Sequence, residues 1–154
     1  MIKIERILVP IDFSEHSYDA LSYAAELAKL FQAEIRLFHA IDDAIFLVGA
    51  SPYATLAAAS HESLLEDSRE ALTRCQQARV PEGVKSSWDV AFGAPAEEIV
   101  RAAQVFDCQL IVISTHGHTG LAHVLLGSVA ERVVRKSACP VLVVKRPVSA
   151  FMAS

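Results

Sequence analysis

The sequence predicts a single α/β domain over residues 1–154, with a five-stranded parallel sheet and helices on both of its faces. Short apolar runs alternate with segments of helical periodicity along the chain, and the connections are long enough for helical crossovers. Hydrophobic residues make up 53% of the chain and aromatic residues only 7%, so aliphatic side chains supply the core. This composition is typical of strands that are buried on both faces of a parallel sheet.

The first strand, helix and second strand are predicted within residues 6–41. Residues 6–11 form a short apolar run that indicates a buried strand. Ser14 is a good N-cap for the helix that follows, and Glu15 is favourably placed in the helix dipole. A second apolar strand is expected at 34–41. The apolar stripe of the helix between them consists of Leu21, Ala24, Ala25, Ala28 and Phe31.

The remaining elements repeat the same alternation. Residues 44–55 contain glycine, serine and proline and are expected to form a loop. A long helix is predicted over 56–79, ended by Pro-Glu-Gly, and a shorter helix opens at Pro95. The last helix is marked by Val129, Val133 and Val134. Further strands are expected at 84–92, 110–113 and 140–144.

Charge and cysteine content restrict the class of protein. The formal net charge of -4 provides no basic surface, so neither nucleic acid nor an anionic membrane is an expected partner. The sequence has no apolar run long enough to span a bilayer, and its first residues do not resemble a signal peptide. Cys75, Cys108 and Cys139 form no CxxC pair or disulfide framework, which favours a reducing cytoplasm and buried thiols.

The loop 114–128 is the strongest candidate for a binding site. It follows a buried strand and runs into a helix, whose first N–H groups and dipole favour an anion such as phosphate. Two structural explanations stay open beside this one. Ser128 and Glu131 have the spacing of a capping box, and Gly127 has the character of a tight-turn residue.

The chemistry of this loop argues against a fast phosphoryl-transfer enzyme. The chain contains neither GxxxxGK[ST] nor GxGxxG, and the loop contains no lysine or arginine. Backbone amides, hydroxyls and a bound cation would have to offset the negative charge of a triphosphate. His116, His118 and His123 do not have the spacing of a standard zinc site and are interpreted as loop histidines, with His116 bracing the loop.

Three motifs resemble those of the universal stress protein family, in the same order and over nearly the whole chain. They are Val-Pro-Ile-Asp-Phe-Ser at 9–14, the loop 114–128, and Cys-Pro-Val-Leu-Val-Val at 139–144. ATP-binding members of that family carry Gly-x-x-Gly, nine residues, then Gly-Ser/Thr. Gly117, Gly127 and Ser128 match this spacing, whereas Ser114 occupies the first glycine position. This difference, with His118 and Ala130, predicts a weakened affinity for ATP.

The resemblance implies the strand order 3-2-1-4-5 and a ligand at the reversal of strand order, between the first and fourth strands. ATP with Mg²⁺ or Mn²⁺ is the implied ligand. Asp12 has a second interpretation, as the start of an Asx turn before Ser14, but the ligand role is favoured. No catalytic or metal-ligating residue is assigned. The predicted site residues are Pro10, Ile11, Asp12 and Ala40 around the nucleoside, and Ser114, His116, Gly117, Gly127, Ser128, Val129 and Ala130 in the loop and helix.

The same order places the last strand, with the apolar residues Val141–Val144, at an edge of the sheet. An exposed apolar edge favours pairing with a second copy in a twofold dimer, and the resemblance implies the same homodimer. In the alternative, residues 146–154 fold back over this edge. The predicted function is a cytoplasmic, ATP-binding homodimer that acts in stress response as a nucleotide-dependent regulator and not as an enzyme. A dimeric scaffold without nucleotide and a slow ATPase or kinase-like enzyme are the alternatives.

Overall fold

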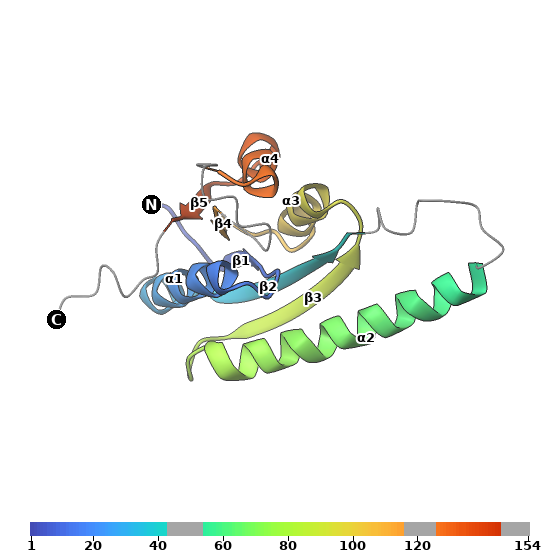
Figure 1. Cartoon of the computed structure of the whole chain (residues 1–154). Helices are drawn as coiled ribbons and strands as arrows, with labels where there is room; N and C mark the ends of the chain where they lie inside the picture. The colour runs from blue at the N-terminus through green and yellow to red at the C-terminus, as the bar shows by residue number, and fades with distance from the viewer. Residues whose placement is uncertain (43–53, 116–125, 146–154) are drawn as a thin grey trace.

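The computed structural model describes residues 1–42, 54–115 and 126–145, with the backbone alone for 54–59. Strands and helices alternate throughout (Figure 1). No helix of the described part has the length and apolar character that a membrane span requires. The strands are β1 (Arg6–Pro10), β2 (Glu34–Ile41), β3 (Ser86–Phe92), β4 (Leu110–Ser114) and β5 (Val141–Val144). The helices are α1 (Glu15–Phe31), α2 (Ala54–Arg79), α3 (Pro95–Val105) and α4 (Ser128–Lys136).

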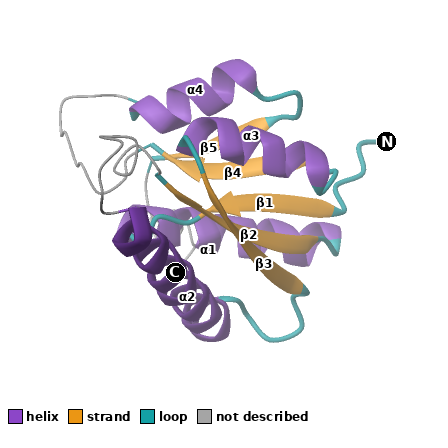
Figure 2. Ribbon diagram, turned by 90° about the vertical axis from the view of Figure 1, so that its right-hand side faces the viewer, coloured by secondary structure: helices purple, strands orange, loops and turns teal. Residues whose placement is uncertain are grey.

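The sheet is parallel, and its strands lie in the order β3-β2-β1-β4-β5, which confirms the predicted fold class and strand order. Helices α1 and α2 cover one face and α3 and α4 the other (Figure 2). The order of the strands reverses between β1 and β4, which are paired through Ile7 with Leu110 and Leu8 with Ile111. The predicted reversal therefore lies where the family motifs placed it.

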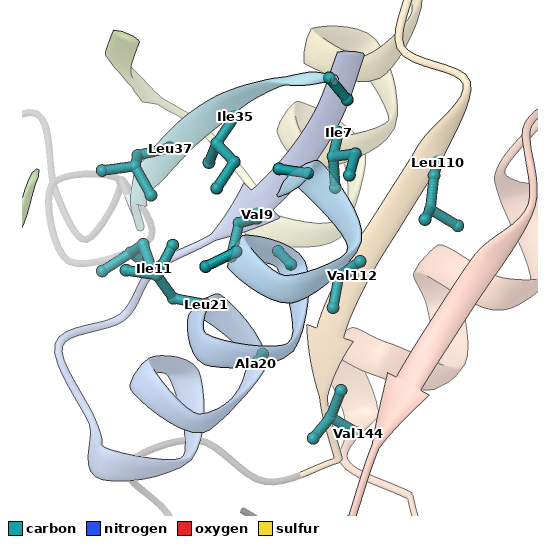
Figure 3. Close-up of a cluster of buried hydrophobic side chains, with 14 of the residues drawn as sticks. Ile7, Val9, Ile11, Ala20, Leu21, Ile35, Leu37, Leu110, Val112 and Val144 are labelled. Carbon is teal, nitrogen blue, oxygen red and sulfur yellow. The ribbon is translucent and has the colours of Figure 1, made fainter. Parts of the chain in front are cut away.

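Two aliphatic clusters hold the helices on the sheet. Side chains of alternate strand residues point to opposite faces, so Ile7 and Val9 pack under α1 whereas Leu8 packs under α3 and α4. All three are fully buried, and each such side chain contributes roughly 1.5–3 kcal/mol relative to exposure. Figure 3 shows the cluster beneath α1, where Leu21 meets side chains from β1, β2 and β4.

One residue of the predicted α1 stripe, and one of the valines that marked the last helix, are exposed. Leu21 and the three alanines of the α1 stripe are buried, but Phe31 is 45% exposed because α1 ends there and Gln32 turns the chain in a left-handed conformation. In α4, Val133 is fully buried and Val134 is 45% exposed. Val134 lies about 100° further round the helix than Val133, which turns its side chain away from the sheet and toward solvent.

The boundaries of the elements differ from the predictions by one or two residues. Helix α2 begins at Ala54 and β3 at Ser86, two residues away from their predicted starts. Strand β1 ends at Pro10, β4 extends to Ser114, and β5 begins at Val141. The loop predicted at 44–55 lies mostly outside the described residues. These shifts leave the order and the type of every element unchanged.

Candidate functional site

A cleft of about 410 Å³ opens at the carboxyl ends of β1, β2 and β4, at the point where the strand order reverses. Ligands of open α/β sheets bind at this position, because the loops on either side of the reversal separate there. The first turns of α1, α3 and α4 also reach the cleft. The described lining residues are Pro10, Ile11, Asp12, Ser17, Phe38, His39, Ala40, Asp42, Pro95, Ile99, Ile113, Ser114, Thr115, Gly127, Ser128, Val129 and Ala130.

The structure brings nine of the predicted site residues together in this cleft. Two more predicted residues, His116 and Gly117, lie outside the described residues. The nine come from three separate segments of the chain: Pro10, Ile11 and Asp12; Ala40; and Ser114, Gly127, Ser128, Val129 and Ala130.

The sequence missed several lining residues, chiefly at the end of β2. His39 and Asp42 flank the predicted Ala40, and both line the cleft. Ser17, in the first turn of α1, lines it as well. Their position in the sequence could have indicated them. Residues near the carboxyl end of a strand lie at the same edge of the sheet as the switch point, where ligands bind.

The turn between β1 and α1 is fixed by side-chain hydrogen bonds. Asp12 Oδ1 accepts hydrogen bonds from the backbone N–H of Ser14 at 3.0 Å and from its hydroxyl at 2.5 Å. Ser14 Oγ in turn accepts from the Ser17 N–H at 3.2 Å and caps α1. The Asx-turn interpretation of Asp12 and the predicted N-cap are therefore both confirmed, while Asp12 also lines the cleft.

His39 reaches this turn from the neighbouring strand β2. Its Nδ1 lies 2.7 Å from the carbonyl oxygen of Ile11, and its ring centroid lies 4.6 Å from that of Phe13. Phe13 has φ of 64°, in the left-handed region that residues other than glycine seldom adopt. The backbone N–H of Ile11 donates to the Phe38 carbonyl at 2.8 Å. Strand β2 thus holds the turn through a side chain as well as through the backbone.

On the opposite side, backbone hydrogen bonds connect α4 to the end of β4. The Gly127 N–H donates to the Thr115 carbonyl at 2.6 Å, and the Thr115 N–H donates to the Val144 carbonyl at 3.1 Å. Gly127 is the N-cap of α4, with φ of -64° and ψ of 153°. Gly127 is therefore the extended N-cap of α4 and not a tight-turn residue, and its backbone angles suit any residue.

The capping-box interpretation of Ser128 and Glu131 is also wrong. Ser128 is exposed and is the first residue of α4, one position after the N-cap. Glu131 Oε1 accepts a hydrogen bond from Arg135 Nη2 at 2.6 Å along the outer face of the helix. The N-cap of α4 is therefore Gly127, and no side chain caps the helix.

The comparisons with known proteins agree with this geometry. Residues 3–145 match the model of the universal stress protein family. The chain belongs to that family. Universal stress protein MJ0531 of Methanocaldococcus jannaschii is 40% identical over 148 residues, which are 93% of this chain and 83% of that protein.

Solved structures of family members have the same fold. The structure of MJ0577, a universal stress protein of the same archaeon, superposes with a TM-score of 0.84 at 32% identity, covering 94% of this chain and 98% of that one. A universal stress protein solved in complex with cAMP has a TM-score of 0.62 at 26% identity, covering 94% and 98% of the two chains. The second of these is a nucleotide complex.

In this family member, the described lining of the cleft carries two carboxylates but no lysine or arginine. Asp12 and Asp42 are the two carboxylates, and no described lining residue is lysine or arginine. Residues 43–53 and 116–125 contain no lysine or arginine in the sequence. Backbone N–H groups at the start of α4 and a divalent cation would therefore have to offset the charge of an anionic ligand.

Thiols and histidines contribute no second site within the described residues. Cys75 and Cys108 are buried as predicted, whereas Cys139, which was predicted to be buried as well, is only half-buried. Burial raises the pKa of the Cys75 and Cys108 thiols, that of Cys108 to about 11. Both are therefore protonated near neutral pH, which suppresses nucleophilic chemistry. No cluster of three potential metal ligands occurs in the described part of the chain. His116, His118 and His123 lie outside it.

Proposed function

We propose that this universal stress protein binds an adenine nucleotide, ATP with Mg²⁺ or Mn²⁺, and acts as a cytoplasmic, nucleotide-dependent regulator in stress response. One observation carries the proposal: residues picked out by the family motifs converge from three segments on one cleft at the switch point. The cleft has the size of a small-ligand pocket, which is usually ~300–1,000 Å³. The similar protein solved with cAMP supports the same ligand class.

The two sides of the cleft suit the two parts of a nucleotide. The apolar surfaces of Pro10, Ile11 and Ala40 would hold the base, and the Asp12 carboxylate would accept hydrogen bonds from ribose hydroxyls. The phosphates would lie at the amino end of α4, where Gly127 lets them approach the backbone and Ser128 adds a hydroxyl. Mg²⁺ or Mn²⁺ would offset the charge between the phosphates and the carboxylates.

A regulatory role is favoured over catalysis by the charges of the lining. Rapid phosphoryl transfer needs positively charged groups that contact the transferred phosphoryl oxygens, and the described lining has Asp12 and Asp42 but no lysine or arginine. The slow ATPase remains the rival enzyme. ATP turnover well above background that disappears in Asp12→Ala would favour the enzyme over the regulator.

The direct test is calorimetric titration of the purified protein with ATP and Mg²⁺, and in parallel with AMP and GTP. Saturable binding of ATP supports the proposal, and the difference between ATP and AMP measures what the added phosphates contribute. Absence of binding at millimolar ATP contradicts it. The scaffold that works without nucleotide would then be the leading function.

We propose further that the functional unit is a homodimer joined through β5, Val141–Val144. This strand is at the edge of the sheet, and Leu142 is 37% exposed. The β4 N–H groups of Ile111 and Thr115 donate to the carbonyls of Pro140 and Val144. Alternation along the strand therefore directs the backbone polar groups of Val143 away from β4, toward a second copy.

Val143→Pro tests the dimer, because it removes an N–H directed outward and leaves the hydrogen bonds to β4 in place. We expect the mass measured by light scattering to fall from dimer to monomer. Deletion of residues 146–154 tests the alternative that these residues cover the edge. Under the proposal the shortened chain stays dimeric, whereas a monomeric full chain that dimerises on deletion would favour the covering tail.

A further inference from the structure

We propose that His39 is a positioning residue for the cleft: it holds the turn from Ile11 to Ser14 in place and thereby fixes where Asp12 presents its carboxylate. This inference rests on the proposed function, because it assigns the control of the nucleotide site to a residue of β2. The family motifs at 9–14 and 114–128 do not include His39, and the contacts of its ring point to the role.

The turn requires support from outside, because its backbone is in an unfavourable conformation. Phe13 has φ of 64°, and a side chain in that region is disfavoured by contact between its Cβ and the backbone. Such a conformation persists where surrounding contacts over-determine it. The Asx turn of Asp12 and Ser14 is one such contact, but it lies within the turn itself.

His39 supplies the contacts from outside. Its ring packs on Phe13 with centroids 4.6 Å apart and planes inclined by 46°. Its Nδ1 lies 2.7 Å from the Ile11 carbonyl oxygen, which can only accept, so Nδ1 carries the hydrogen of this bond. The two contacts hold the residues on either side of Asp12. The carboxylate is thus fixed between two points tied to β2.

The structure also distinguishes this role from a plain core contact. His39 is half-buried and lines the cleft, whereas Ile11 is 2% exposed. Loss of the imidazole donor leaves the buried Ile11 carbonyl without this hydrogen bond, and the turn must shift to regain one. A shift of the turn moves Asp12, and the hydrogen bonds that its carboxylate could make to a ligand weaken when their distance or angle departs from the preferred range.

Two substitutions separate the hydrogen bond from the ring. His39→Asn places an amide N–H near the position of Nδ1, and His39→Phe keeps an aromatic ring without the donor. For ATP with Mg²⁺, we expect affinity to fall about tenfold in His39→Phe and about threefold in His39→Asn, as lost hydrogen bonds of this kind predict. The reverse order would mean that the ring contacts the ligand directly, and it would overturn the proposal.

His61→Phe is the matched control. His61 of α2 makes a similar contact with Phe92, with ring centroids 4.7 Å apart, and it does not line the cleft. We expect this variant to bind ATP with the affinity of the parent protein. A tenfold loss in this variant too would show that the effect of His39→Phe is a general loss of packing.

A double-mutant cycle tests whether His39 acts through Asp12. Asp12→Asn retains the oxygen that accepts from Ser14 and removes the charge. If His39 only positions this carboxylate, His39→Phe weakens binding much less in the Asp12→Asn protein than in the parent. Equal losses in the two backgrounds would mean that the residues act independently, which contradicts the proposal.

Hydrogen exchange of the ligand-free protein separates this inference from the proposed function. The Ser14 N–H, bonded to Asp12, reports the state of the turn. We expect its protection to fall about tenfold or more in His39→Phe and to be unchanged in His61→Phe. Unchanged protection in His39→Phe overturns the inference. If protection falls in His39→Phe but the parent protein binds no nucleotide, His39 supports the turn and the proposed function is wrong.

Discussion

Helices α1, α3 and α4 all begin at the cleft, and the N-termini of α1 and α4 are built in opposite ways. Helix α1 begins after Ser14, whose side chain caps the helix and is itself held by Asp12. Helix α4 begins after Gly127, which has no side chain with which to cap it. At α1 the polar groups satisfy one another within the protein. At α4 the backbone itself faces the cleft, so this end is suited to an anionic group.

The difference assigns the two ends of a nucleotide to the two helices. The α1 side has a defined shape, set by the Asx turn, by Phe13 and by His39, which suits recognition of a base and a sugar. The α4 side offers N–H groups and little side-chain bulk, which suits phosphate. The substitutions of Gly127, Ser14 and Ser128 below each change one side and leave the other intact.

The largest effect is expected for Gly127→Val. A branched side chain at the N-cap of α4 occupies the space of the phosphates, so affinity for ATP should fall roughly 100-fold or more. The backbone angles of Gly127 suit valine, so the fold and the oligomeric mass should be retained. Calorimetry and light scattering measure the two outcomes.

Ser137→Val provides the control for this substitution. Ser137 is the C-cap of the same helix, and its φ of -68° and ψ of 137° are close to those of Gly127. It does not line the cleft, so ATP affinity should not change. Parent-like binding by Gly127→Val would show that the phosphates do not lie at α4.

The next largest effect is expected from removal of the divalent cation. Asp12 and Asp42 repel a free triphosphate, so chelation with EDTA should weaken ATP binding about tenfold or more. Chelation should weaken the binding of AMP less than that of ATP, because AMP has one phosphate. The affinity for adenosine, which has no phosphate, should hardly change. Affinities measured with and without Mg²⁺ give this order directly. ATP binding that is indifferent to Mg²⁺ would mean that the phosphates lie away from both carboxylates.

The smallest effects are expected on stability, for substitutions at the N-termini of α1 and α4. Ser14→Ala removes the cap of α1 and the partner of Asp12, and should lower the free energy of unfolding by about 1–2 kcal/mol. Ser128→Ala changes an exposed residue after the N-cap and should stay within about 0.5 kcal/mol. Urea denaturation measures both. Equal losses would restore the capping role of Ser128.

Much of the site could be predicted from local sequence. The cap at Ser14 and the Asx turn at Asp12 follow from residue types a few positions apart, and short-range hydrogen bonds depend on little else. His39 could not be predicted in this way. Its partners Ile11 and Phe13 lie in the turn that follows the neighbouring strand β1, and only the pairing of β1 with β2 brings them into contact with His39.

The sequence by itself determined the α/β class and the order of the elements, because apolar periodicity reports which residues must be buried. The family motifs supplied the strand order and nine of the residues that line the cleft. The tertiary structure decided that Gly127 is the N-cap of α4 and that no capping box forms, that Val134 is exposed beside the buried Val133, and that His39 contacts the turn at Asp12. These features depend on how whole helices and strands are placed against each other, and that placement minimises exposed apolar surface over the entire domain.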